Sequence, residues 1–120
     1  MMTLNHLNLC VRDVPEARTL FTTYFGFRAL TEKEKPPLAV LEGENGFVLV
    51  LSRFTDETPV YPKAFHIGFM QESPEKVWEV YRTLQAGGVT LPHEPRPVHG
   101  SFGFYFTALG GILIEVGAEA

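Results

Sequence analysis

Residues 6–11, HLNLCV, and residues 66–71, HIGFMQ, decide the fold because they open the same pattern twice. Their offset, 66 minus 6, is half of the 120-residue chain. Each stretch is followed by a helix-capping residue, Asp13 or Ser73, and then by a Pro-Glu pair. Each half later has a glycine followed by an apolar stretch, at 46–51 and 111–116. The shared order indicates a duplicated structural unit.

Two helices are predicted directly after the capping residues. Beyond Asp13, apolar residues recur at helical spacing, and Gly26 is suited to end that helix. Beyond Ser73, Pro74 fits the first helical position, and a second apolar stripe runs to Gly87-Gly88. Each half therefore begins with a strand and continues into an amphipathic helix.

The remaining apolar segments predict strands. These are 3–11, 38–42, 46–53, 64–71, 102–108 and 111–117, with weaker strands near 27–32 and 89–94. Residues 92–100, rich in Pro and His, are predicted as a loop. The fold class is therefore α+β: two tandem βαβββ units forming a curled, cup-shaped mixed sheet with helices outside. Unit 1 is expected at 1–54, a linker at 55–63 and unit 2 at 64–120, within one domain, 1–120.

Alternation along the first strand of each unit predicts which way the histidines face. His6 shares its face with Asn8, and His66 shares its face with Gly68, whereas the opposite faces are apolar. The apolar face should pack on the unit's own helix. The histidines should then look away from the helices into the cup, related by a pseudo-twofold axis.

Glu115 is the one charge in the strand ILIEV, 112–116. A carboxylate there is costly to bury unpaired, and a cation opposite two histidines removes that cost. His6, His66 and Glu115 would form a 2-His-1-carboxylate site for a divalent metal ion, Fe, Mn, Ni or Zn. Taken singly, each has an ordinary alternative: a hydrogen-bonded strand histidine, or a glutamate at a solvated sheet edge. Their joint placement in the repeat favours the metal site.

Composition excludes several classes of function. The net charge is −4 with acidic and basic residues mixed, so no basic stripe suggests nucleic acid. No apolar run approaches the roughly 20 residues needed to cross a membrane. The N-terminal residues lack the pattern of a secretory signal, and the one cysteine cannot form an internal disulfide. A soluble, cytoplasmic protein is expected.

The pattern resembles the vicinal oxygen chelate superfamily, which includes glyoxalase I, fosfomycin-inactivating thiol transferases, extradiol dioxygenases and bleomycin-resistance proteins. The resemblance covers nearly the whole chain. It is carried by LNHLNL at 4–9, YFGF at 24–27, FHI at 65–67, FYF at 104–106 and GILIE at 111–115. It places His6, His66 and Glu115 on the family's metal-ligand positions. It also implies a small-molecule substrate and a homodimer.

Two positions refine the resemblance. Glyoxalase I has a further carboxylate where this chain has Val50, and valine can neither ligate a metal nor take a proton. That difference argues against glyoxalase I proper. Tyr105 falls where the fosfomycin-type enzymes place a substrate-contacting tyrosine, which implies orienting substrate or stabilising charge; alternatively it fills the cup. The loop 96–101 does not match the cation-binding loop of those enzymes.

Three hypotheses for function follow. The first is a metal-dependent enzyme acting on a substrate that chelates the ion through vicinal oxygens: a lyase, isomerase, thiol transferase or dioxygenase. The second is a non-catalytic small-ligand or antibiotic-binding protein of the bleomycin-resistance kind. The third is a structural relic with an empty site. The residues leave the substrate and the ion open.

Overall fold

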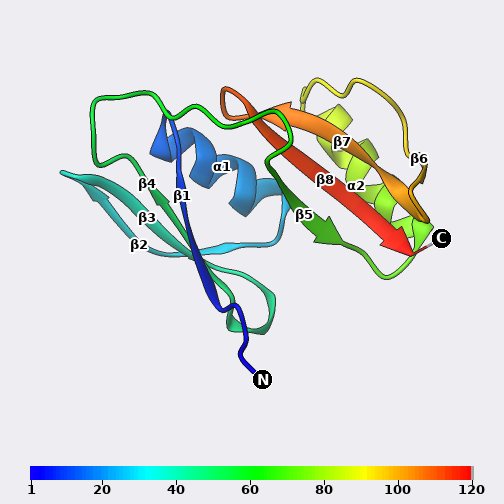
Figure 1. Cartoon of the computed structure of the whole chain (residues 1–120), viewed down its shortest axis with the longest axis horizontal. Coiled ribbons are helices and arrows are strands. Elements are labelled where there is room, and N and C mark those ends of the chain that lie inside the picture. Colours follow the sequence, from blue (N-terminus) through cyan, green and yellow to red (C-terminus); the bar gives the residue numbers. More distant parts are fainter. Residues whose placement is uncertain (120) are drawn as a thin grey trace. The chain divides into compact units, whose positions relative to one another are not determined.

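The computed structural model describes residues 1–119, which fall into two compact units. Unit 1 comprises residues 1–60, and unit 2 begins at Tyr61. Each unit runs strand, helix and then three strands, so the predicted α+β class and tandem βαβββ order are confirmed (Figure 1). Among the described residues no helix has the length and apolarity to span a membrane.

Unit 1 is an open mixed sheet covered on one face by one helix. Its elements within residues 1–60 are β1 (His6–Cys10), α1 (Val14–Tyr24), β2 (Arg28–Glu34), β3 (Pro37–Glu42), the short 3-10 helix η1 (Glu44–Gly46) and β4 (Val48–Ser52). The strand order is β1-β4-β3-β2, with β1 parallel to β4 and the other pairs antiparallel. The helix α1 packs against β2, β3 and β4.

Unit 2 repeats this arrangement. Its elements up to Glu119 are β5 (His66–Met70), α2 (Pro74–Ala86), β6 (Arg96–Val98), β7 (Ser101–Ala108) and β8 (Ile112–Glu119). The strand order is β5-β8-β7-β6, with β5 parallel to β8. The helix α2 packs against β7 and β8 (Figure 1).

The position of β6 corrects one prediction. The expected strand at 89–94 is not formed there; it lies at Arg96–Val98, inside the segment predicted as a loop. Pro92 and Pro95 lack the N–H that a strand ladder needs. The β6–β7 hairpin instead closes through His99 and Gly100, both with positive φ (45° and 83°), which is the requirement of a tight two-residue turn.

Both helices begin as predicted. The Glu16 amide donates to the Asp13 carboxylate over 2.9 Å, and the Lys76 amide donates to the Ser73 hydroxyl over 3.3 Å. These caps satisfy amide groups that have no partner within the helix. Gly26, with φ of 75°, follows the end of α1 and supplies the left-handed residue that helix ends favour.

Each unit has its own apolar core between sheet and helix. Fully buried side chains of unit 1 include Leu9, Phe21, Leu41 and Leu51; those of unit 2 include Val77, Leu84, Phe104, Phe106, Ile114 and Val116. Burying one such side chain is worth about 1.5–3 kcal/mol. Because these residues alternate with the site residues along the strands, the core also fixes which way the site residues point.

Candidate metal centre

Burial along β1 and β5 confirms the predicted direction of the histidines. In β1, His6, Asn8 and Cys10 are exposed while Leu9 is buried. In β5, His66, Gly68 and Met70 are exposed while Ile67 and Phe69 are partly buried. Within each unit the histidine therefore lies on the sheet face opposite the helix.

Three predicted site residues come together on that face of unit 2. Glu115 on β8 lies directly opposite Tyr105 on β7 and Gly68 on β5. The Nε2 atom of His66 is 3.5 Å from the Oε1 atom of Glu115. The His66 and Tyr105 rings meet edge to face with centroids 5.9 Å apart. Strand pairing thus assembles an imidazole, a carboxylate and a phenol from three strands.

The hydrogen bond at Nδ1 of His66 determines whether its Nε2 atom can act as a ligand. Its Nδ1 atom lies 3.0 Å from the Ala64 carbonyl oxygen. A carbonyl only accepts, so Nδ1 carries the proton and Nε2 of the neutral ring carries a lone pair. That lone pair faces the Glu115 carboxylate, so a proton or a cation must lie between them. A backbone carbonyl behind a ligating imidazole is the usual partner in metal sites, so the donor set fits a divalent transition metal.

Burial and charge distinguish the three groups. The Glu115 side chain is 21% exposed and that of His66 is 43% exposed. Burial raises the pKa of the Tyr105 phenol, and hydrogen bonding to Glu115 and the charge of Glu115 raise that pKa further. The phenol is therefore a neutral hydrogen-bond donor near pH 7.

His6 occupies the equivalent position in unit 1. His6 pairs with Val48 across β1 and β4, as His66 pairs with Leu113 across β5 and β8. Its Nδ1 atom lies 2.7 Å from the Asn5 side-chain oxygen, which likewise leaves Nε2 as the lone-pair atom. In the part of the chain that the structure describes, no three His, Cys, Asp or Glu side chains form a cluster able to hold a metal. The predicted triad combines residues of both units.

The strand register also shows which residue of unit 2 corresponds to Val50. Asn8 pairs with Val50 in unit 1, as Gly68 pairs with Glu115 in unit 2. Val50 is therefore the structural counterpart of Glu115. Unit 1 has no carboxylate at the position where unit 2 supplies one.

His93 is a site neighbour that the sequence did not single out. Its Nε2 atom accepts from the Tyr105 amide over 3.4 Å, and its Nδ1 atom lies 2.8 Å from the Glu94 carbonyl oxygen. The amide of Tyr105 lies beyond the end of β6, whose pairing with β7 begins at Arg96 and Gly103. The imidazole thus replaces a strand partner and supports Tyr105. Arg96 itself is exposed.

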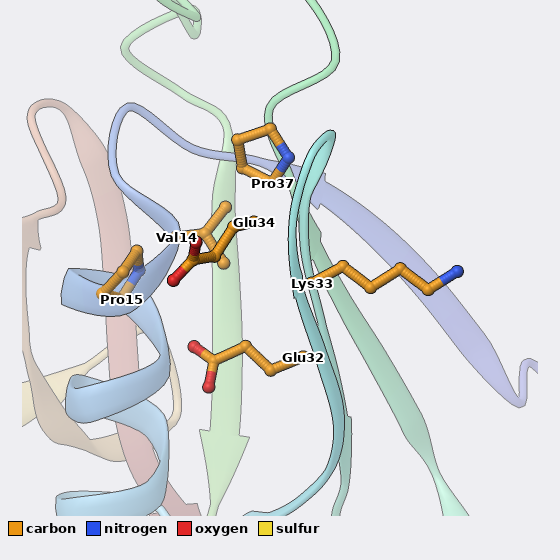
Figure 2. A pocket seen from close by; sticks show the side chains of 6 residues that line it. All are labelled: Val14, Pro15, Glu32, Lys33, Glu34 and Pro37. Atoms are coloured by element: carbon orange, nitrogen blue, oxygen red, sulfur yellow. The ribbon is translucent and has the colours of Figure 1, made fainter.

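A separate hollow of about 420 Å³ lies in unit 1, between the start of α1 and the β2–β3 hairpin. It is lined by Val14, Pro15, Glu32, Lys33, Glu34 and Pro37. Figure 2 shows Glu32 and Glu34 pointing toward α1 and Lys33 pointing away from it. Glu32 already pairs with Arg18 over 3.1 Å. None of the predicted ligands lines this hollow.

Comparison with known proteins agrees with this architecture. Residues 3–116 match the family model of the Glyoxalase/Bleomycin resistance protein/Dioxygenase superfamily. A structure described as a possible glyoxalase from Bacillus cereus is 38% identical, with a TM-score of 0.82, covering 97% of this chain and 98% of that chain. Comparison with curated proteins gives no match.

Two more distant structures share the fold. A genomically encoded fosfomycin resistance protein from Listeria monocytogenes is 22% identical with a TM-score of 0.76, covering 100% of this chain and 95% of that one. Lactoylglutathione lyase from Agrobacterium tumefaciens is 17% identical with a TM-score of 0.76, covering 97% and 92%.

Proposed function

Because the chain belongs to the Glyoxalase/Bleomycin resistance protein/Dioxygenase superfamily, we propose that it is a metal-dependent enzyme acting on a small oxygenated substrate. His6, His66 and Glu115 would hold one divalent ion, Fe, Mn, Ni or Zn. The substrate would bind that ion through two neighbouring oxygens. The reaction would be that of a lyase, isomerase, thiol transferase or dioxygenase.

One observation carries the proposal: the lone-pair atom Nε2 of His66 faces Glu115 Oε1 at 3.5 Å. The Ala64 carbonyl holds the proton of His66 on the opposite nitrogen. A lone pair and a carboxylate oxygen that converge at this distance need a positive group between them. A proton there would make an imidazolium–carboxylate pair, and a divalent ion there would make the ligand pair that we propose.

Each residue has a distinct task in this proposal. A bound divalent ion supplies Lewis acidity toward vicinal oxygens. Tyr105, a phenol that is neutral near pH 7 and whose pKa is raised further by burial and by Glu115, donates a hydrogen bond toward Glu115 or toward a substrate oxygen as charge develops there. The Ala64 carbonyl and the Asn5 side chain hold the two imidazoles in the ligating tautomer. His93 holds the Tyr105 segment of β7.

Val50 restricts the reaction. Glyoxalase I would be expected to have a second carboxylate at this position, which transfers a proton. Valine cannot transfer a proton. The proposal therefore favours a three-ligand reaction, such as thiol transfer or ring cleavage, over that of glyoxalase I. The alternative function is a binding protein that sequesters a small ligand or an antibiotic without chemistry.

Metal titration tests the proposal. Protein purified without chelator should contain about one equivalent of divalent metal per chain, and calorimetric titration of stripped protein should show one site per chain. His66→Ala and Glu115→Gln should each weaken metal binding by roughly tenfold to a hundredfold or more. The matched control is Glu119→Gln, on the same strand and exposed, which should bind as the parent does. Absence of binding for every ion of the set would refute the metal-dependent enzyme.

Activity on a panel separates the chemistries. Hemithioacetals, catechols and epoxide antibiotics report lyase, dioxygenase and thiol-transfer reactions respectively. Metal binding without turnover on any of them, together with tight binding of an unreacted ligand, would favour the sequestering protein.

Complementation tests whether the proposed site is built within one chain or shared in a homodimer. His6→Ala and His66→Ala proteins, each defective alone, are mixed and allowed to exchange subunits. If His6 comes from the second chain, each mixed dimer regains one intact site, which restores about a quarter of all sites. If each chain builds its own site, the mixture stays as defective as its components.

A further inference from the structure

Two glycines flank the Glu115 carboxylate. Gly68 lies directly opposite Glu115 on β5, and Gly117 lies two residues further along β8. A Cβ atom at Gly68 would lie 3.4 Å from Glu115 Oε1, and one at Gly117 would lie 3.8 Å from Oε2. The backbone on both sides of the carboxylate therefore carries no side chain. We call Gly68 and Gly117 together the glycine gap.

Unit 1 shows that the fold does not require these glycines. Cys10 pairs with Ser52 as Met70 pairs with Gly117, and Asn8 pairs with Val50 as Gly68 pairs with Glu115. The counterparts of the glycine gap are thus Asn8 and Ser52. The Ser52 hydroxyl donates to the Asn8 side-chain oxygen over 2.6 Å, and Ser52 is fully buried. Side chains fill this position in unit 1, whereas in unit 2 no side chain projects from it beside the carboxylate.

The glycine gap lies beside the Glu115 carboxylate and the Phe102 carbonyl oxygen, and the side chains next to these oxygens are Met70 and Tyr105. Tyr105 is half-buried opposite Glu115. Met70 is 61% exposed, and its Cε atom would lie 3.8 Å from a Cβ at Gly117, so it covers that glycine. A thioether chain is flexible and contacts aromatic groups favourably. Met70 can therefore move aside for a flat ring, which would then lie between its sulfur and the Tyr105 phenol.

We propose that Gly68 and Gly117 determine specificity, by admitting a flat apolar group attached to the metal-binding oxygens of the substrate. The substrate class is then an aryl-bearing bidentate oxygen ligand rather than a small aliphatic one. The inference rests on the proposed function, because the oxygens of that ligand need the metal. The bare backbone beside Glu115 sets where the ring can lie, and Tyr105 and Met70 form its sides.

Two hydroxamates that chelate through vicinal oxygens test this. The full-length protein is first titrated with Ni²⁺, a redox-stable member of the expected set, and then with acetohydroxamate or benzohydroxamate by calorimetry. The parent protein should bind benzohydroxamate roughly tenfold or more tighter than acetohydroxamate, because only the first places a ring in the glycine gap. Equal affinities would overturn the inference. Failure at the Ni²⁺ step would instead refute the metal centre, so the two failures are distinguishable.

The decisive variant gives unit 2 the residues that unit 1 has at these two positions. Gly68→Asn/Gly117→Ser introduces the pair that unit 1 already accommodates at the same register, so folding should be retained. Its affinity for benzohydroxamate should fall roughly tenfold, while that for acetohydroxamate should stay within about threefold. Gly117→Ala, whose new Cβ would make only ordinary contacts with the Phe102 carbonyl oxygen, Glu115 and Met70, checks the result without adding a polar group. Benzohydroxamate affinity unchanged in both variants would overturn the inference.

Discussion

Replacing Gly103 with alanine should destabilise unit 2 more than the same replacement at Gly68 or Gly117. A Cβ at Gly103 would lie 2.2 Å from the Val116 carbonyl oxygen and 2.8 Å from the Gly117 Cα atom. All of its nearest neighbours are backbone atoms of β8, so no side chain can move to relieve the contact. Gly103 and Gly117 are directly opposed in the β7–β8 pair, whose separation the strand hydrogen bonds fix.

The expected loss of stability follows from the structural change that relieves this contact. Relief of the contact requires β7 and β8 to separate locally, which combines overpacking of about 1–3 kcal/mol with loss of a ladder hydrogen bond worth about 1 kcal/mol. We expect Gly103→Ala to lower the free energy of unfolding by about 3 kcal/mol. In a unit of this size that corresponds to a fall in Tm of roughly 12 °C or more.

Trp78 makes the measurement specific to unit 2. It is the only tryptophan of the chain and lies in α2, with its ring 5.6 Å from that of Tyr81. Urea titration followed by tryptophan fluorescence therefore reports on unit 2. The control is Gly68→Ala, in the same sheet, whose new Cβ would meet only the Glu115 side chain, at 3.4 Å. Its stability should stay within about 0.5 kcal/mol of the parent. Equal unfolding midpoints for the two variants would refute the steric argument.

Three further predictions concern the caps and the neighbours of the site. Asp13→Ala and Ser73→Ala should each cost about 1 kcal/mol of unfolding free energy by urea titration, and a loss below the error of the measurement would contradict the capping role. In metal-free protein the pKa of Tyr105 should lie above its ordinary value, and Glu115→Gln should lower that pKa while burial keeps it raised; phenolate absorbance measured against Tyr105→Phe checks this. Because the folded-state pKa is raised, the stability contributed by Tyr105 is complete below its unfolded pKa of about 10 and is lost as pH rises through the folded value. His93→Ala should speed amide hydrogen exchange at Tyr105, and unchanged exchange would show that the imidazole does not protect it.

The fold was predictable where its signals are local. The caps at Asp13 and Ser73 and the glycine after α1 are read from a few adjacent residues, and the repeat then supplies the order of the strands. The strand β6 was misplaced because its turn, His99-Gly100, uses a histidine with positive φ, where asparagine or aspartate is the usual signal. Pro97 also argued against a strand, although an edge strand tolerates proline.

The part of the candidate site that depends on side-chain alternation along the strands was predictable. Alternation places His66, Gly68 and Glu115 on the helix-free face, and pairing brings their strands together. The part played by His93 depends on where β6 ends, so no pattern of residue types signals it. The tautomer of His66 likewise depends on the Ala64 carbonyl, which belongs to the backbone rather than to any side chain.

The duplicated fold gives the site an internal comparison. At matching register, unit 1 has Val50 flanked by the bonded Asn8–Ser52 pair, and unit 2 has Glu115 flanked by two glycines. Core packing does not require this difference, since both residue sets occupy the same position in the same kind of sheet. The half with the carboxylate is also the half that lacks side chains at the positions of Asn8 and Ser52, although His66 and Tyr105 remain as partners of Glu115. A carboxylate that binds a ligand needs the space that those two side chains would fill.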